Sequence, residues 1–434
     1  MPSPTTIPPQ SFEVAWGKLA ASKVGAVTKQ SKILIWSVLA GLIVLVAASI
    51  AFTFAFSTLG TKSVTATKLA IPPASESPTA AAVALPSGFK PESASFVSSQ
   101  TGFVLGIAHC TSGYCLTIAR TQDGGTTWSS IPAPNVSLTQ SGDPKSSIGS
   151  VSQIRFLTIN DGYLFGPDLY ATHDRGATWQ KLTLKGIPST SVVTALETNG
   201  SNWYLTAENP NAPTPKTGYL FISNGTSGVF TIQRKPVVPA GARAEITANP
   251  YGAVLNATLN QNDNLFYQAP GSTSWTRIKA NCPVDLPTNP LVALAMPVSG
   301  SSTPQLVLGC KGNTGAGSQE KTVVESRDLA TFTPTKARPP LGGDLGAIAS
   351  PNGETIAVAA SSGATFLYVS TDSGASWKTV ISDPSFGGAP IHDLGFTTAN
   401  QGFAVIGHAT IDGTRTSTFV MTHDQGSSWQ EVSF

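Results

Sequence analysis

Residues 422–429 read THDQGSSW, and the same pattern, [ST]-x-D-x-G-x-[ST]-W, occurs as TQDGGTTW at 121–128, THDRGATW at 172–179 and STDSGASW at 370–377. The Asp carboxylate can accept hydrogen bonds from the backbone of its own tight turn. The Gly two positions later can adopt a positive φ without steric cost. The Trp provides a large apolar anchor where the next strand begins. Four copies of one turn indicate a chain built from repeated units.

We expect these turns to be structural rather than catalytic. Their predicted structural residues are Asp123, Gly125, Trp128, Asp174, Gly176, Trp179, Asp372, Gly374, Trp377, Asp424, Gly426 and Trp429.

The tryptophans define the length of the repeat. Trp128 and Trp179 are 51 residues apart, and Trp377 and Trp429 are 52 apart. The gap of 198 residues from Trp179 to Trp377 leaves room for three degenerate copies, which we place at 223–230, 270–275 and 326–332. Seven units with a spacing of roughly 50 residues are typical of propeller blades.

Each unit contains short runs of β-branched and aromatic residues separated by Gly, Asn, Asp and Pro, which predicts four strands a unit. The repeated octet then falls on the turn between the third and fourth strands. The sequence therefore predicts an all-β, seven-bladed β-propeller over residues 89–434, preceded by one N-terminal transmembrane helix.

The N-terminal part of the chain has the composition of a membrane anchor. Residues 33–57 form a run of 25 residues without a charge, which is long enough to span a bilayer. A cleaved signal peptide is the alternative, but its apolar region is usually only about 7–15 residues long. The lysines of the predicted tail, residues 1–32, favour a cytoplasmic N-terminus and an extracytoplasmic propeller. Residues 58–88, rich in Ser, Thr, Pro and Ala, are a predicted linker.

Charge argues against nucleic acid as a partner. Residues 86–434 contain 20 Lys and Arg against 22 Asp and Glu, so their formal net charge is 20 − 22 = −2. A nucleic-acid-binding surface normally shows a basic patch. The small positive charge of the whole chain belongs to the tail and the linker.

The four cysteines all follow the predicted membrane span, as expected in an oxidising compartment. Four cysteines allow three pairings. Their positions favour Cys110–Cys115 and Cys282–Cys310. No CxxC motif is present, and we expect His109, His392 and His408 to be isolated, so the sequence predicts no metal site.

The octets, together with the phrases TGFVLG (101–106), DGYLFG (161–166) and QGFAVIG (401–407), resemble the Asp-box, or bacterial neuraminidase repeat, superfamily. The pattern is most similar to propellers of the photosystem II assembly and stability factor type. That resemblance implies a non-catalytic scaffold that holds a partner, with the Asp turns away from the binding face. The sialidases of the superfamily carry an Arg-Ile-Pro segment and six blades, and neither feature is expected here.

Five polar residues on predicted inner strands are candidates for binding at the central channel: Gln153, Arg155, Glu245, His392 and Asp393. Strand alternation places Gln153 and Arg155 on one face and Ile154 and Phe156 on the other. The favoured hypothesis is a membrane-anchored, extracytoplasmic scaffold that binds a protein, peptide or glycan, with no catalytic residue and no cofactor.

Two other functions remain open from the sequence. A cell-surface glycoside hydrolase needs two facing carboxylates. Those available are Asp161, Asp168, Glu245, Asp344 and Asp393. A purely structural envelope protein would have neither such a pair nor a binding pocket.

Overall fold

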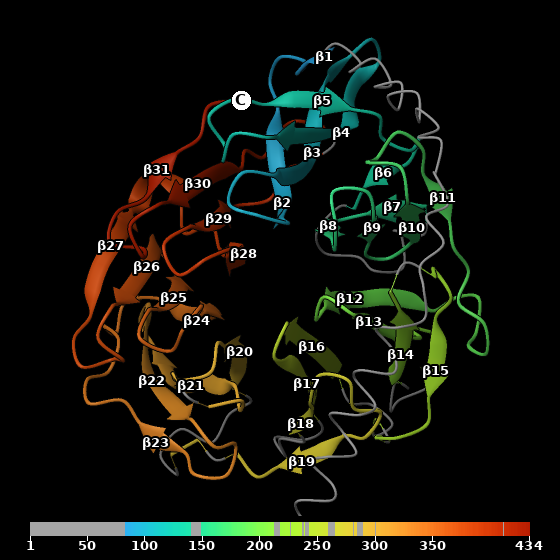
Figure 1. Ribbon diagram of the computed structural model, residues 1–434. Coiled ribbons are helices and arrows are strands. Elements are labelled where there is room, and N and C mark those ends of the chain that lie inside the picture. The colour runs from blue at the N-terminus through green and yellow to red at the C-terminus, as the bar shows by residue number, and fades with distance from the viewer. Residues whose placement is uncertain are drawn as a thin grey trace, which may run out of the picture. The chain divides into compact units, whose positions relative to one another are not determined.

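The β-branched and aromatic runs form antiparallel sheets, and Gly-rich turns connect their strands. In the computed structural model the four main strands of each blade follow chain order from the innermost strand outward. Figure 1 shows seven sheets arranged around a centre, with β2, β8, β12, β16, β20, β24 and β28 innermost. The predicted seven-bladed β-propeller is confirmed for the described part of the chain.

The chain divides into two units, Met1–Pro78 and Thr79–Phe434. The structure describes residues 83–139, 149–211, 218–225, 227–236, 238, 243–258, 265–280, 282–283, 290–299, 301–410 and 412–434. The predicted tail, the predicted membrane span and most of the predicted linker lie outside these residues. Within the described ranges no helix has the length and apolar character needed to cross a membrane.

The strands of the first four blades, from the innermost outward, are as follows: blade 1, β2 (Lys90–Phe96), β3 (Gly102–Cys110), β4 (Gly113–Thr121) and β5 (Ser129–Ile131); blade 2, β8 (Gln153–Phe156), β9 (Gly162–Phe165), β10 (Leu169–Thr172) and β11 (Gln180–Lys181); blade 3, β12 (Val192–Thr198), β13 (Asn202–Glu208), β14 (Gly218–Asn224) and β15 (Thr231–Gln233); blade 4, β16 (Arg243–Asn249), β17 (Gly252–Thr258), β18 (Leu265–Gln268) and β19 (Thr276–Ile278).

The strands of the last three blades follow in the same order: blade 5, β20 (Leu291–Ala295), β21 (Gln305–Gly315), β22 (Ser318–Ser326) and β23 (Thr333–Pro334); blade 6, β24 (Asp344–Ala349), β25 (Ile356–Ser361), β26 (Thr365–Ser370) and β27 (Lys378–Asp383); blade 7, β28 (Ile391–Phe396), β29 (Gly402–Ile406), β30 (Thr418–Thr422) and β31 (Gln430–Glu431).

Four short elements of the described chain lie outside this plan. A parallel pair, β6 (Ser137–Leu138) and β7 (Ser150–Val151), precedes blade 2, and a 3₁₀ turn, η1 (Pro384–Phe386), follows blade 6. The fourth is β1 (Val83–Ala84), which pairs with β5 and adds a fifth strand to blade 1. Because β1 falls within the predicted linker, the sheet of blade 1 includes residues that precede residue 89.

The four repeated octets form the same hydrogen-bonded turn. In the first copy Thr121 Oγ1 donates to Asp123 Oδ1 over 2.8 Å, and Thr127 donates to the same carboxylate from its N–H over 2.9 Å and its hydroxyl over 2.6 Å. These bonds from Thr127 lower the pKa of Asp123 to about 2. The corresponding bonds recur at Asp174, Asp372 and Asp424.

The Gly of each octet is required by its backbone and by its neighbour. Gly374 has a φ of 71°, and a Cβ there would lie 2.4 Å from Cγ2 of Thr335 in the preceding blade. The residue before each of these glycines, such as Arg175 at 67°, also has a positive φ. The octet is therefore a turn that fixes one blade against the one before it.

The phrases that begin with Gly and an aromatic residue have a packing explanation. A Cβ on Gly102 would lie 2.4 Å from the ring of Phe96, the last residue of β2. The Trp of the octet packs against the same Phe, because the rings of Phe96 and Trp128 meet edge to face with centroids 6.4 Å apart. Gly162, Phe156 and Trp179 repeat this arrangement, and so do Gly402, Phe396 and Trp429. The Gly thus makes room for an inner-strand Phe that the Trp covers.

Blades 1 and 7 meet without sharing a strand, because every strand of blade 7 comes from residues 391–431 and every strand of blade 1 from residues 83–131. We call this contact the seam. Buried apolar residues of both blades fill it: Ala94, Val104, Ala119, Phe403, Val405, Phe419 and Met421. Side-chain packing and hydrogen bonds therefore close the ring.

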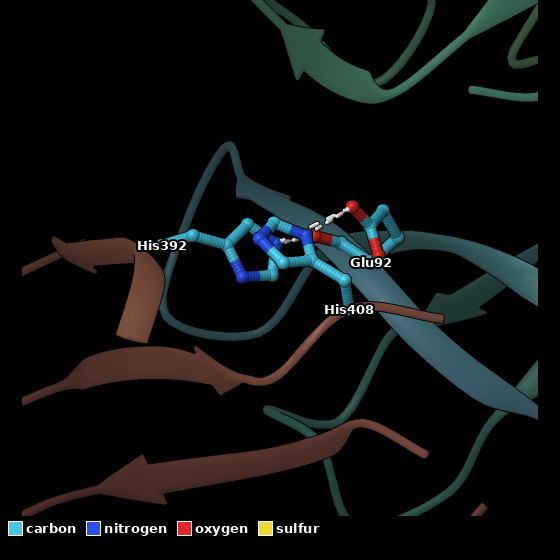
Figure 2. Close-up of side chains that lie close together, drawn as sticks. All are labelled: Glu92, His392 and His408. Atoms are coloured by element: carbon cyan, nitrogen blue, oxygen red, sulfur yellow. Dashed lines mark hydrogen bonds and ion pairs between the residues drawn. The ribbon is translucent and has the colours of Figure 1, made fainter. Parts of the chain in front are cut away.

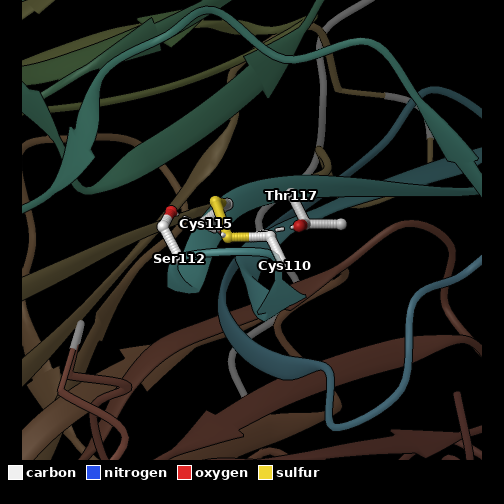
Figure 3. Close-up of a disulfide and its surroundings, with 4 residues drawn as sticks. All are labelled: Cys110, Ser112, Cys115 and Thr117. Atoms are coloured by element: carbon white, nitrogen blue, oxygen red, sulfur yellow. Dashed lines mark hydrogen bonds between the residues drawn. A yellow bond between two sulfur atoms is a disulfide. The ribbon is translucent and has the colours of Figure 1, made fainter.

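Both predicted disulfides are present. Cys110 and Cys115 join β3 to β4 across their tight turn (Figure 3), and Cys282 joins the segment after blade 4 to Cys310 on β21. No free cysteine remains among the described residues.

Candidate functional site

A pocket lies at the centre of the propeller, where the innermost strands end. Its cavity volume is about 710 Å³, and its walls are the last residues of the inner strands and the turns that follow them. Most of the wall is apolar or aromatic, through residues that include Phe96, Phe156, Tyr251, Val292, Met296, Ile348, Leu394 and Phe396.

The pocket and the repeated turns lie at the same end of the blades. The first and third strands of a blade run in the same direction, because both are antiparallel to the second. The octets follow third strands and contact the turns after first strands, as in the bonds from Gly124 N–H to Gln100 O at 2.8 Å and from Gln425 N–H to Asn400 O at 3.1 Å. The resemblance implied that these turns face away from the binding site, whereas here they border the same end at larger radius.

Three charged residues line this pocket: Arg155 on β8, Glu197 on β12 and Asp393 on β28. Arg155 Nε donates to Glu197 Oε1 over 2.9 Å, and its Nη2 lies 3.4 Å from Asp393 Oδ1. Burial alone would lower the pKa of Arg155, but the two carboxylates outweigh it and raise the pKa. When both acids are ionised, the formal charge of the group is +1 − 2 = −1.

The two carboxylates of this network differ in the number of hydrogen bonds that they accept. Asp393 Oδ2 also accepts from Ser93 Oγ at 2.7 Å and from Ala94 N–H at 2.9 Å, across the seam. Glu197 depends mainly on Arg155, and burial raises the pKa of Glu197 more than Arg155 lowers it.

Of the five predicted binding residues, the structure brings Arg155 and Asp393 together in this pocket. Gln153 and Glu245 lie nearer the start of β8 and β16 and are absent from the pocket wall. The predicted alternation is confirmed, because Ile154 and Phe156 are buried while Gln153 and Arg155 are half-buried.

His392 lies near the start of β28, toward the opposite end of the inner strand from the pocket. Its ring stacks on that of His408 with centroids 3.9 Å apart, and both rings lie beside Glu92 of β2 (Figure 2). His408 Nδ1 is 2.9 Å from Glu92 Oε1, and His392 Nε2 is 2.6 Å from the backbone oxygen of Glu92. The expectation that these two histidines are isolated is therefore wrong. Burial lowers the pKa of His392.

The carboxylates proposed for a hydrolase are dispersed. Asp161 accepts from Thr158 Oγ1 at 2.7 Å in its own turn, and Asp168 pairs with Lys181 at 2.6 Å within blade 2. Among those candidates only Asp393 reaches the pocket wall. The other carboxylate of the wall is Glu197, which was not among the residues expected from the sequence.

Glu197 and Glu92 were missed for a positional reason. Glu197 and Arg155 each occupy the position before the last residue of their inner strand, β12 and β8. An alignment of the inner strands on their last residues would have placed both at the pocket. Glu92 lies in the first blade and His408 in the last, 316 residues later. The repeat spacing does not show that these blades are neighbours, and only closure of the ring brings the two residues together.

Comparisons with known proteins find the fold but no family. No protein-family model and no curated protein matches the chain. A structure of YCF48 bound to D1 peptide is 18% identical with a TM-score of 0.47, over 79% of this chain and 96% of that chain. YCF48 from Cyanidioschyzon merolae is 16% identical with a TM-score of 0.44, over 80% and 98%. The β-propeller domain of the Trilobed protease from Pyrococcus furiosus is 9% identical with a TM-score of 0.43, over 80% and 98%. At these identities the similarity concerns the fold alone.

Proposed function

We propose that this chain is a non-catalytic scaffold whose central pocket binds an extended segment of a partner protein. The observation that carries the proposal is the pocket itself: a volume of about 710 Å³, a largely apolar wall and one group of charged residues. Binding sites commonly combine an apolar surface with a few fixed polar groups. The excess negative charge of Arg155, Glu197 and Asp393 favours a segment with a basic side chain next to an apolar one.

The setting of this scaffold is also a proposal. The uncharged run at 33–57 supports a single-pass anchor between a cytoplasmic tail at 1–32 and a linker that begins at residue 58. Two disulfides support an extracytoplasmic propeller. Four identical Asp-centred turns support membership of the Asp-box superfamily.

A peptide array tests the pocket as the binding site. We expect the full-length chain to retain peptides that contain a Lys or Arg beside an apolar residue. Met296→Trp, which places a bulky ring in the pocket wall, should reduce this retention at least about tenfold. Val229→Trp, at a residue 68% exposed, is the matched control and should leave retention unchanged. Equal retention by both variants would place binding elsewhere and overturn the proposal.

A glycoside hydrolase is the second candidate, because Glu197 and Asp393 share the pocket and burial raises the pKa of Glu197. The general acid of a glycoside hydrolase is a carboxyl group whose pKa is raised by its surroundings. A screen with fluorogenic glycosides decides between the two functions. Turnover that disappears in Glu197→Gln and Asp393→Asn would establish the enzyme and remove the scaffold proposal.

A further inference from the structure

Glu92 and His392 occupy equivalent, irregular positions of two neighbouring blades. Each lies four residues before the Phe that ends its inner strand, Phe96 or Phe396. The register of β2 with β3 shifts at Glu92, and that of β28 with β29 shifts at His392. Such bulges redirect a side chain out of the regular pleat. Here two bulges direct a carboxylate and an imidazole toward the same point on the seam.

His408, just after β29, completes the group (Figure 2). One ligand atom from each of Glu92, His392 and His408 lies within 4.8 Å of the other two. Glu92 Oε1 is 2.9 Å from His408 Nδ1 and 3.6 Å from His392 Nε2. A tetrahedral zinc ion with bonds of about 2.0–2.2 Å holds its ligand atoms roughly 3.3–3.6 Å apart. The spacing is therefore close to that of a zinc site.

The surroundings of these groups also suit a metal ion. Ala409 N–H donates to Glu92 Oε2 over 2.8 Å, which fixes the carboxylate with Oε1 toward the histidines. His392 Nδ1 is buried and has no hydrogen-bond partner among the described residues. If Nε2 binds a metal in place of its contact with the backbone oxygen of Glu92, a proton on Nε2 can move to Nδ1. The stacked rings must turn slightly apart to direct both nitrogens at one ion.

The geometry points to a zinc site formed by Glu92, His392 and His408 on the seam between blades 1 and 7. Two imidazoles and one carboxylate are a ligand set that zinc uses, with water in the fourth position. Because Glu92 belongs to blade 1 and both histidines to blade 7, bound zinc connects the two ends of the ring. The ion takes the place of the shared strand that this propeller lacks.

Zinc titration of the chelator-treated, full-length chain tests this site. We expect one zinc ion per chain by calorimetry, and a rise in Tm of about 3–4 °C when free zinc is 100 times its Kd. His408→Gln and His392→Gln should each weaken zinc binding at least about 100-fold. His109→Gln is the matched control, since His109 contacts Tyr114 in blade 1 and lies outside the group. Equal zinc affinity in all three variants would overturn the proposal.

A measurement on the unaltered chain guards against a variant that fails to fold. Cobalt(II) in place of zinc should give the visible absorption of a four-coordinate ion with nitrogen and oxygen ligands, and zinc should displace it. Calcium should leave Tm unchanged, because it prefers six to eight oxygen ligands. The site does not exist if two results are both negative. Cobalt would produce no such spectrum, and zinc at 100 times the chain concentration, on the order of 1 mM, would not bind with one ion per chain.

Discussion

At the scale of single residues, the repeated turn shows how few positions carry the fold. The Asp carboxylate satisfies the turn backbone, and the following Gly permits close contact with the preceding blade. Thr335 illustrates the second role. Its hydroxyl donates to Ala337 O over 2.8 Å, which holds the side chain next to the position that a Cβ on residue 374 would occupy. The two requirements for a Gly, its backbone angle and its packing, can be separated here by experiment.

Gly374→Ala should destabilise the chain more than Gly271→Ala, although both glycines have a φ of 71°. The positive φ costs an alanine about 1 kcal/mol at either position. At Gly374 the contact with Thr335 adds about 1–3 kcal/mol of overpacking, whereas nothing lies within 4 Å of a Cβ at Gly271. Urea denaturation measures both values. Equal losses would show that the backbone angle alone matters.

A buried acid makes stability depend on pH. Glu325 of β22 is half-buried, and its Oε1 makes no hydrogen bond to any described residue. Burial raises its pKa from 4.5 to about 7. The folded state thus binds this proton more tightly than the unfolded state, so the contribution is fully present below pH 4.5 and is lost as pH rises through about 7.

Glu325→Gln should therefore stabilise the chain at pH 8 by about 1–2 kcal/mol, a range reduced for solvent screening. The gain should shrink toward zero at about pH 5, where the native carboxyl is already protonated. Glu320→Gln, at an exposed position of the same strand, serves as the control. A gain in stability that is independent of pH would contradict the raised pKa of Glu325. Melting curves at both pH values provide the comparison.

At the scale of elements, the sequence predicted the repeat better than the site. The period of the tryptophans and the phrases that begin with Gly and an aromatic residue were enough for the blade count, because blades 1, 2 and 7 repeat one local packing arrangement and blade 6 repeats the octet turn. Arg155 and Asp393 were recognisable as polar residues on inner strands. Glu197, which pairs with Arg155, and Glu92, which pairs with His408, were not recognisable, because these contacts join different blades over 42 and 316 residues of sequence. Local patterns carry no information about such contacts.

The two disulfides should contribute unequally. Cys282 and Cys310 are 28 residues apart, and Cys110 and Cys115 only 5. In the chain-entropy description, closing the longer loop stabilises by about 3.6 kcal/mol and the shorter by about 2 kcal/mol. Replacement of each pair by alanine, followed by guanidinium denaturation, tests this order. A larger loss from Cys110→Ala with Cys115→Ala would mean that the hairpin, and not loop closure, determines the effect.

At the scale of the whole molecule, the seam determines whether the blades form a ring. Its core is apolar, but its polar bonds converge on a few side chains. Asp393 alone accepts from Ser93, Ala94 and Arg155, and Glu92 accepts from Ala409 and contacts His408. The same arginine reaches the central pocket, so ring closure and the shape of the pocket wall depend on one network.

Asp393→Asn should open the seam before any blade unfolds. Removal of one partner of a buried ion pair costs about 3–5 kcal/mol. Hydrogen exchange should then accelerate first in β2 and β28, with smaller changes in blades 4 and 5. Asp168→Asn removes an ion pair within blade 2 whose Lys181 is half exposed, and should cost less than about 1 kcal/mol. Uniform acceleration across all blades would show that the ring unfolds as one unit.

Ring closure without a shared strand has a consequence for how the fold can evolve. Each blade of this propeller is one uninterrupted stretch of about 50 residues, the typical length of such a repeat. Duplication or loss of one such gene segment would leave every remaining sheet intact, since no strand would be separated from its partners. Every contact between neighbouring blades, the seam included, would adopt a slightly different angle. A lineage with this design can thus change its number of blades by single genetic events.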